Sequence, residues 1–411
     1  MKRILHSLIL LTLTATTGLF SSCSMMKEDI EDCPAGLYVR YVYDYNTARA
    51  DMFKDHVGHI MLYVYDEYGN KVTSRSVSNT GDTGPLAKYG YATHFQDGEL
   101  KDGKYRLVAI GMQKDWDEAL NTPGAKYRRN HDHERVEELH IDLDRGSEKL
   151  PDTDLYPVSN EAPLDTMWHT LKVISEAPTD GLEDPGVHAT KPPYSVRPFE
   201  EQYVEVKSGR ATYATISLIR DTKHLNITLR QIDDPDNMFD CNYDAYITVS
   251  NRSVGHDNEL SSYEHVQYTP YHQWTTRFNE DGTVTIDPTR PEDYKPVMSK
   301  APTGPNDVMR TAHFNMMFNR IIDRPQDPML KAPVLVIVNR QSGKTVAELN
   351  LSSVLAEGRH AYYTYNYSPQ EYLDREYDYH LNFLLKGDSW AYCDIVINVL
   401  GWSKRVQNVD F

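Results

Sequence analysis

The chain has 411 residues, and its 60 acidic side chains outnumber its 43 basic ones, which gives a formal net charge of −17. A chain of this length accommodates two or three domains that bury their own cores. Binding to nucleic acid needs basic patches that neutralise phosphates, so a nucleic-acid-binding function is not expected.

The first 23 residues, MKRILHSLILLTLTATTGLFSSC, have the parts of a secretory signal. Lys2 and Arg3 form a positive start, a mostly apolar run extends to Phe20, and two serines precede Cys23. A transmembrane helix is one alternative, but a span needs about 20 apolar residues. An ordinary secretory signal with an incidental cysteine is another. We interpret residues 1–22 as a lipoprotein signal peptide, although Phe20 stands where such signals usually have Leu.

We expect Cys23 to carry covalent lipid, an S-diacylglycerol and an N-acyl chain, and we expect no other cofactor. One acyl chain gives only reversible membrane binding, whereas several chains give long-lived attachment. Residues 23–34 follow as an acidic tether, in which Glu28, Asp29, Glu31 and Asp32 resemble the export tag of surface lipoproteins in Bacteroidetes-type bacteria. The expected location is the outer membrane, with the folded part exposed at the cell surface.

The remaining cysteines do not indicate a disulfide framework. Cys33, Cys241 and Cys393 have no CxxC spacing, and three cysteines cannot all pair within one chain. Cys393 lies in an apolar strand pattern, which predicts a buried thiol.

Alternation of apolar and polar residues with a period of two predicts an all-β fold, with two β-sandwich domains in tandem. The first domain is expected over residues 35–208. Its predicted elements are strands over 37–43, 59–66, 105–112 and 203–206, a short helix over 115–120, and a proline-rich loop over 174–200.

The second domain is expected over residues 209–411, with the boundary near Gly209. Thr212–Leu218 is predicted as its first strand, followed after Asp221 by a half-solvated antiparallel strand. Further predicted elements are a hairpin of 333–338 with 345–351, and a hairpin of 377–385 with 391–399 across Gly387-Asp388.

The histidine clusters do not predict a metal site. His131, Asp132 and His133, with His140 following, stand among charged residues and are interpreted as a solvated polar face. His56 and His59 lie three residues apart in a pattern that is strand-like, so we expect them on opposite faces.

The carboxylates and motifs do not predict an enzyme. Asp152 and Asp154 lack the ligand loop of an EF-hand, and Asp142 and Asp144 show no sign of a cleft. The sequence has no GxSxG, HExxH, Walker A or GxGxxG motif. We interpret Trp168 as a buried residue beside His169 at a strand edge, and we expect no catalytic residue.

Four segments then stand in a characteristic order. They are Cys23 followed by DCP and GLYVRYVYDYN, then HVGHIMLYVYDEYGNKV, then ISLIRDTKHLNITLRQ, and finally WAYCDIVINVLGWSKRVQNVDF. Together they resemble the fimbrium anchoring subunit family, the FimB-type lipoproteins of Bacteroidales. One departure is Thr170 after Trp168-His169, where the family usually has Gly.

The resemblance implies two transthyretin-like β-sandwich domains and an outer-membrane lipoprotein at the base of a fimbrium. It implies fimbrial structural subunits as partners, an influence on fimbrial length, and contact by strand exchange, in which one subunit's strand completes another's sheet. The leading hypothesis is therefore a non-enzymatic anchor with lipid on Cys23. The abundance of Tyr, with five Trp, leaves a surface glycan-binding lipoprotein as the alternative, and scattered carboxylates and histidines leave a hydrolase as a third possibility.

Overall fold

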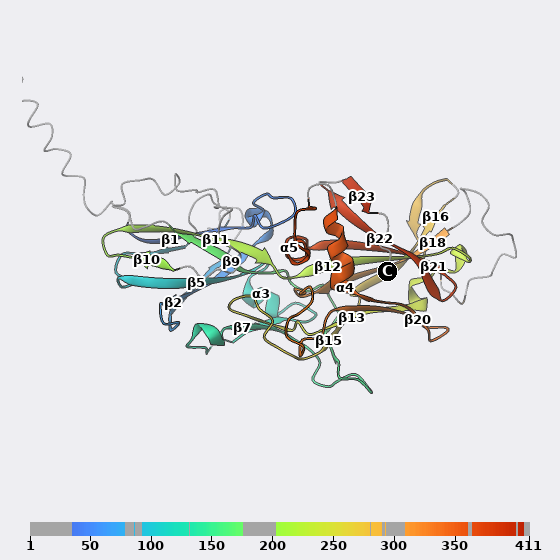
Figure 1. Cartoon of the computed structure of the whole chain (residues 1–411), viewed down its shortest axis with the longest axis horizontal. Helices are drawn as coiled ribbons and strands as arrows, with labels where there is room; N and C mark the ends of the chain where they lie inside the picture. Colours follow the sequence, from blue (N-terminus) through green and yellow to red (C-terminus); the bar gives the residue numbers. More distant parts are fainter. Residues whose placement is uncertain are drawn as a thin grey trace, which may run out of the picture.

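The computed structural model describes residues 35–78, 86, 93–130, 132–175, 203–279, 281–289, 292, 309–360, 364–399 and 402–406. The predicted signal peptide and tether, with Cys23 and Cys33, lie outside the described residues. Figure 1 shows two halves that follow one another along the long axis of the molecule.

The first half is built on an eight-stranded sheet with the order β3-β2-β5-β9-β11-β1-β4, in which β10 also pairs with β5. Its strands are β1 (Gly36–Val42), β2 (His59–Asp66), β3 (Lys71–Ser78), β4 (Thr93–Phe95), β5 (Gly103–Met112), β9 (Met167–Ser175), β10 (Val204–Val206) and β11 (Ala211–Arg220). A three-stranded sheet, β14-β7-β6, consists of β6 (Tyr127–Arg129), β7 (His140–Leu143) and β14 (Ser253–Gly255).

The second half packs a seven-stranded sheet, β17-β16-β18-β12-β21-β22-β23, against a five-stranded sheet, β20-β19-β13-β15-β8. The seven-stranded sheet consists of β12 (Lys223–Gln231), β16 (His272–Phe278), β17 (Val284–Ile286), β18 (Met309–Phe318), β21 (Asp378–Lys386), β22 (Ser389–Val399) and β23 (Trp402–Val406). The five-stranded sheet consists of β8 (Tyr156–Pro157), β13 (Tyr243–Val249), β15 (Val266–Tyr268), β19 (Val334–Asn339) and β20 (Thr345–Asn350).

The helices of the described chain are short and connect strands. The α-helices are α2 (Phe53–His56), α3 (Trp116–Leu120), α4 (Leu351–Ala356) and α5 (Pro369–Arg375), and the 3₁₀ helices span Val136–Glu138, Pro235–Asn237, Asp240–Asn242 and Glu357–His360. Helix α3 lies where the sequence predicts a helix. The all-β class with tandem sandwiches is confirmed.

Strand β2 is apolar at consecutive positions and does not alternate between apolar and polar residues. Its even-numbered side chains, such as Leu62, enter a core enclosed by the eight-stranded sheet. Its odd-numbered side chains, such as Tyr63 and Tyr65, enter a larger core that continues into the second half. A strand covered on both faces is expected to be apolar at both parities, since neither face meets water.

The structure corrects the predicted start of the second half. The strand predicted to open that half, Thr212–Leu218, is part of β11 and pairs with β1 and β9 in the first sheet. The chain changes sheets at Asp221–Thr222, between β11 and β12, rather than at Gly209. A two-residue period identifies a strand but not its partner, which is why the sequence pattern did not place β11 in the first sheet.

The two halves also exchange short strands. Tyr156–Pro157, from the first half of the sequence, pairs with β15 in the five-stranded sheet. Ser253–Gly255, from the second half, pairs with β7 in the three-stranded sheet. The halves are therefore joined by backbone hydrogen bonds as well as by the covalent chain.

The C-terminal hairpin forms as predicted. Strands β21 and β22 pair across the two residues Gly387 and Asp388, and Gly387 has the positive φ of 57° that a turn with Gly first requires. Cys393 is buried, as predicted. Strand β22 pairs with β21 on one side and β23 on the other, so it is an internal strand of this sheet.

Candidate functional site at the junction of the two halves

The link between β11 and β12 is embedded in the protein rather than exposed as a flexible connection. Asp221 and Thr222 are both fully buried. The backbone N–H of Asp221 donates to the carbonyl of Met167 at 2.9 Å, and the N–H of Met167 donates to Oγ1 of Thr222 at 3.0 Å. The Tyr127 hydroxyl contacts the same Oγ1 at 3.0 Å. The link is thereby fastened to β9 and β6 of the first half.

Buried charges surround this link. The guanidinium of Arg320 donates to both carboxylate oxygens of Asp374, from Nε at 2.8 Å and from Nη2 at 3.0 Å. The ammonium of Lys223 donates to the backbone carbonyls of Asp374 and Glu376, each at 2.9 Å. These side chains are almost completely excluded from solvent, so their pairing is a condition for the fold.

The protonation of this cluster follows from burial. Desolvation raises the pKa of Asp221 to about 7, although the positive charges of Arg320 and Lys223 act in the opposite direction. Desolvation lowers the pKa of Lys223 to about 8. Burial alone would lower the pKa of Arg320, but the carboxylate of Asp374 outweighs it and the pKa is raised. Arg320 is therefore a permanent buried cation.

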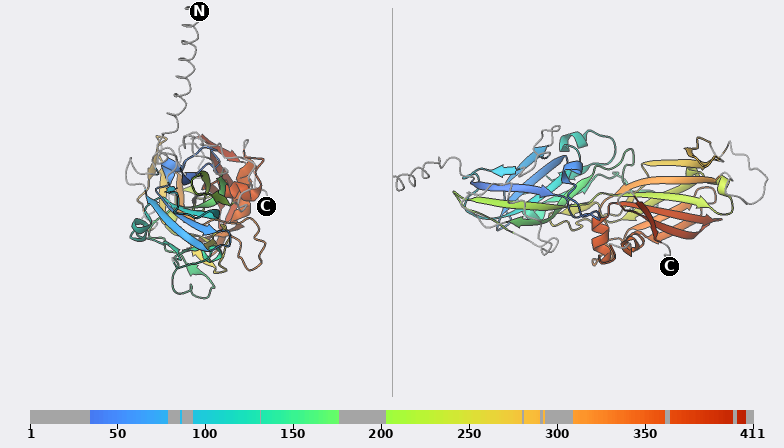
Figure 2. Two further views of the ribbon diagram at one scale, coloured as in Figure 1. Left: turned by 90° about the vertical axis from the view of Figure 1, so that its left-hand side faces the viewer. Right: turned by 90° about the horizontal axis from the view of Figure 1, so that it is seen from above.

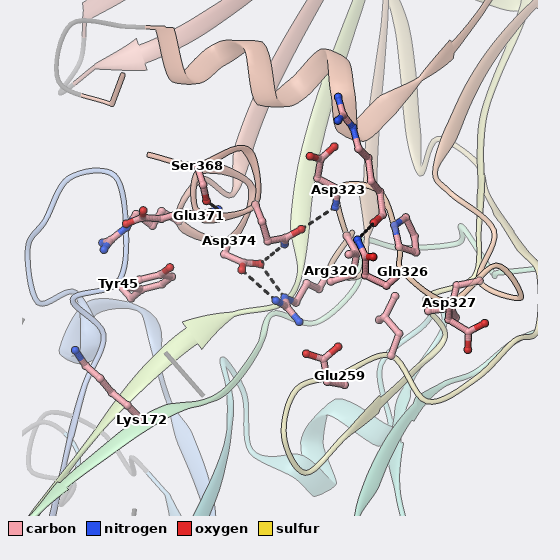
Figure 3. A pocket seen from close by; sticks show the side chains of 17 residues that line it. Tyr45, Lys172, Glu259, Arg320, Asp323, Gln326, Asp327, Ser368, Glu371 and Asp374 are labelled. Atoms are coloured by element: carbon pink, nitrogen blue, oxygen red, sulfur yellow. Dashed lines mark hydrogen bonds and ion pairs between the residues drawn. The ribbon is translucent and has the colours of Figure 1, made fainter. Parts of the chain in front are cut away.

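A pocket of about 800 Å³ opens beside this ion pair (Figure 3). Helix α5 and the segment 320–330 provide most of its wall, and the first half contributes Tyr45 and Lys172. Gln370 holds the floor together, since its amide donates to Asp374 at 2.9 Å and accepts from the N–H of Asp323 at 2.7 Å. The buried polar groups at the floor of the pocket thus bond to one another.

The loop after β1 belongs to the first half and contacts the second half at the junction. Tyr45 lies under the guanidinium of Arg375, whose Cζ is 3.9 Å from the ring centre. Thr47 donates to Glu376 at 3.0 Å, and Arg49 donates to the hydroxyl of Tyr367 at 2.9 Å. These contacts hold the two halves to each other at the junction.

The structure does not assemble the histidines into a metal site. Among the described residues, no group of three or more His, Cys, Asp or Glu side chains could hold a metal ion. His131 lies outside the described residues. His133 was predicted on a solvated face but is buried, with Nε2 2.7 Å from the Tyr65 hydroxyl and Nδ1 2.8 Å from the Asn130 carbonyl. The sequence around His133 could not reveal this contact, because Tyr65 belongs to the distant strand β2.

Two further histidine predictions need correction. His56 belongs to helix α2 rather than to a strand, while His59 begins β2 and contacts the Ser76 hydroxyl at 2.7 Å. Trp168 is buried as predicted, but His169 is not at a strand edge, since β9 lies between β5 and β11. Burial lowers the pKa of His169 to about 4, so its ring is neutral at neutral pH.

The carboxylates that lie close together in the sequence pair with separate basic side chains. Asp142 lies 3.3 Å from Arg252, and Asp144 accepts three hydrogen bonds from Arg128, two from Nε at 3.1 Å and one from Nη2 at 3.0 Å. Asp154 lies 3.2 Å from His265. None of these contacts resembles an acid/base pair facing a cleft.

No helix in the described part of the chain is long and apolar enough to cross a membrane. The fold and junction define an elongated, two-part β-sandwich protein with a pocket at the junction between its halves.

The family follows from comparison with known proteins. A family model described as the fimbrillin-A associated anchor proteins Mfa1 and Mfa2 matches residues 30–408. The chain therefore belongs to this family of anchor proteins, which confirms the resemblance found in the sequence. No curated protein sequence matches the chain.

Solved structures share the fold at low identity. A candidate adhesin from Bacteroides thetaiotaomicron matches with a TM-score of 0.61 and 21% identity, over 91% of this chain and 99% of the other. A candidate polysaccharide-binding protein from the same organism has a TM-score of 0.56 and 23% identity, with the same coverage. The fimbrial anchor protein Mfa2 from Porphyromonas gingivalis has a TM-score of 0.50 and 13% identity, over 90% and 99%.

The buried ion pair predicts that removing one of its charges destabilises the protein more than removing both. Asp374→Asn leaves the Arg320 cation buried without its counterion, and we expect the free energy of unfolding to fall by about 3–5 kcal/mol. The double variant Arg320→Met, Asp374→Leu removes both charges and should lose less. Urea unfolding measures both. The control is Asp144→Asn, which breaks an exposed pair with Arg128 and should cost at most about 1 kcal/mol. Equal losses in Asp374→Asn and Asp144→Asn would contradict the assignment.

Asp221 predicts a pH dependence of stability. Its folded pKa of about 7 lies above the unfolded value of about 3.9, so the native state retains a proton over that interval. The stability of the wild type relative to Asp221→Asn should therefore fall as pH rises from about 4 to about 7 and change little above. Urea unfolding of both proteins at a series of pH values measures this difference. A difference that stays constant across the interval, or rises with pH, would refute it.

Proposed function

We propose that this protein is an outer-membrane lipoprotein that anchors a fimbrium to the cell surface through lipid on Cys23. Membership of the anchor protein family supports the fimbrial part of the proposal. The signal-like segment that ends at Cys23 supports the lipid attachment.

One observation carries the proposal, namely the course of the strands between the N-terminal end and the second half. Strand β1 pairs in parallel with β11 over seven residue pairs, from Gly36↔Ala211 to Val42↔Ser217. Strand β11 then continues through Asp221 and Thr222 into β12, in the middle of the seven-stranded sheet. We call β11 with β12 the spine, because it runs through both halves.

This arrangement suits a protein under tension. A membrane attachment pulls β1 from its Gly36 end, while a load on the second half pulls β11 from its Arg220 end. The two strands are parallel, so the forces act in opposite directions along the β1–β11 ladder. The ladder is then sheared, and all its hydrogen bonds share the load. Each backbone bond contributes only about 1 kcal/mol, so sharing the load among them matters.

The proposed partners are fimbrial structural subunits, contacted by addition of a strand to a sheet edge, and the outer membrane through the lipid. Because a polymer held at its base stays on the cell, the anchor is also proposed to influence fimbrial length. The family consists of anchor proteins rather than enzymes. We propose no catalytic activity, metal or cofactor beyond the lipid.

Three tryptophans of the described residues give no support to the alternative of glycan binding. Trp116 and Trp168 are buried. Trp274 is stacked between His272 and His313, with ring centres 4.6 and 4.9 Å away. Stacking on a sugar needs an open aromatic face, and these three tryptophans do not provide one.

The Cys23→Ala variant tests the proposal. It should abolish incorporation of labelled fatty acid and release both the protein and its fimbriae from the outer-membrane fraction. The matched control is Cys33→Ala, which removes the next cysteine and should leave acylation and fimbriae unchanged. Acylated Cys23→Ala protein would disprove the lipid site. Fimbriae that remain in the membrane fraction after the anchor is released would disprove the anchoring role.

A further inference from the structure

Strand β17 forms one edge of the seven-stranded sheet and exposes apolar side chains. Val284 is 63% exposed and Ile286 is 72% exposed, and the two point to the same face because they are two residues apart. Among the described strands, β16 alone pairs with β17, so its other edge has no described partner strand.

The hydrogen bonds to β16 fix the direction of the backbone groups of β17. Asn279 donates to the carbonyl of Thr283, and Asp287 donates to the carbonyl of Thr275. In an antiparallel ladder, hydrogen-bonded pairs alternate with unbonded pairs, so the N–H and C=O groups of Val284 and Ile286 point away from β16. The outer edge of β17 thus presents both main-chain donors and acceptors.

Two longer edge strands, β3 and β20, carry charged residues that oppose strand addition. Strand β3 carries Lys71 and Arg75, and β20 carries Glu348. The three residues of β17, Val-Thr-Ile, include no charge. The edge of β17 therefore carries no charge that would oppose pairing with an extended chain.

An apolar row continues from this edge onto the sheet. Val284 faces Phe278 on β16, and Phe278 faces Met309 on β18. The side chain of Met309 is 43% exposed. A strand added beside β17 could pack apolar side chains against Val284 and Ile286 at the end of this row, burying surface that now meets water.

The edge lies at the end of the molecule farthest from the start of β1. Lys223, next to the junction, pairs with Phe318 of β18, whereas Met309 lies at the other end of that strand. Figures 1 and 2 place β16 and β18 beyond the junction, at the opposite end from β1. A partner bound here would lie at the end of the spine opposite to the start of β1.

We propose that the outer edge of β17 accepts an extended, uncharged segment of a fimbrial subunit, with apolar residues at alternate positions. This inference rests on the proposed anchoring function and assigns the subunit contact to one strand. The added segment would bond to the main chain of Val284 and Ile286 and pack its apolar residues against their exposed side chains.

The test is the double variant Val284→Lys, Ile286→Lys, expressed in the native cell in place of the wild type. Two charges on the edge should reduce the fimbrial subunit that co-purifies with the anchor at least tenfold, measured by an antibody to that subunit. A second variant, Ile286→Pro, removes one outward N–H and leaves the bonds to β16, and it should show the same direction of change. The control is Val72→Lys on the edge strand β3, where Val72 is 45% exposed.

The outcomes separate this inference from the proposed function. Variants at Val284 and Ile286 that are folded, acylated and still retain wild-type amounts of subunit would overturn the β17 contact. If Cys23→Ala releases the fimbriae in the same strain, the anchoring function survives that result. Loss of subunit with Val72→Lys to the same degree would also overturn the assignment to β17.

Discussion

The continuity of β11 and β12 is the constraint on which the rest of the molecule depends. One strand belongs to the sheet of the first half and the next belongs to the sheet of the second, with only Asp221 and Thr222 between them. Because the link is buried and bonded to β9 and β6, the two sheets cannot turn about it freely. The strands exchanged between the halves, β8 and β14, reinforce the same geometry.

Burying charged groups at this link requires a desolvation free energy that an apolar core would not require. Moving Arg320 and Asp374 out of water costs several kcal/mol per ion, and their attraction recovers this only with good geometry. Their forked bond and the contacts of Lys223 to main-chain carbonyls satisfy directional groups, whereas apolar packing is not directional. We infer that the cluster specifies the orientation of the halves more than it adds stability. An anchor benefits from a fixed orientation, since a load then follows one path.

Much of the fold could be predicted from the sequence because it depends on local patterns. The period of two identified β1 and the hairpin across Gly387-Asp388, where the glycine supplies the turn geometry, and continuous apolar runs identified β2 and β5. The pattern did not reveal that β11 pairs with β1, because strand periodicity carries no information about partners. The junction was also hidden, since Arg320 and Asp374 are 54 residues apart and only the topology brings them together. The lipid site at Cys23 is predicted from the signal pattern alone, and this residue lies outside the described residues.

The central claim is that load passes in shear through the β1–β11 ladder, and single-molecule pulling tests it most directly. The mature protein would be pulled between residue 23 and Gly282, in the turn beyond β16, and separately between residue 23 and Ser208, just before β11. The first geometry shears the ladder, whereas the second peels it open from the Gly36 end. The account predicts that rupture in the first geometry needs several times the force of the second. Equal forces in the two geometries would contradict it.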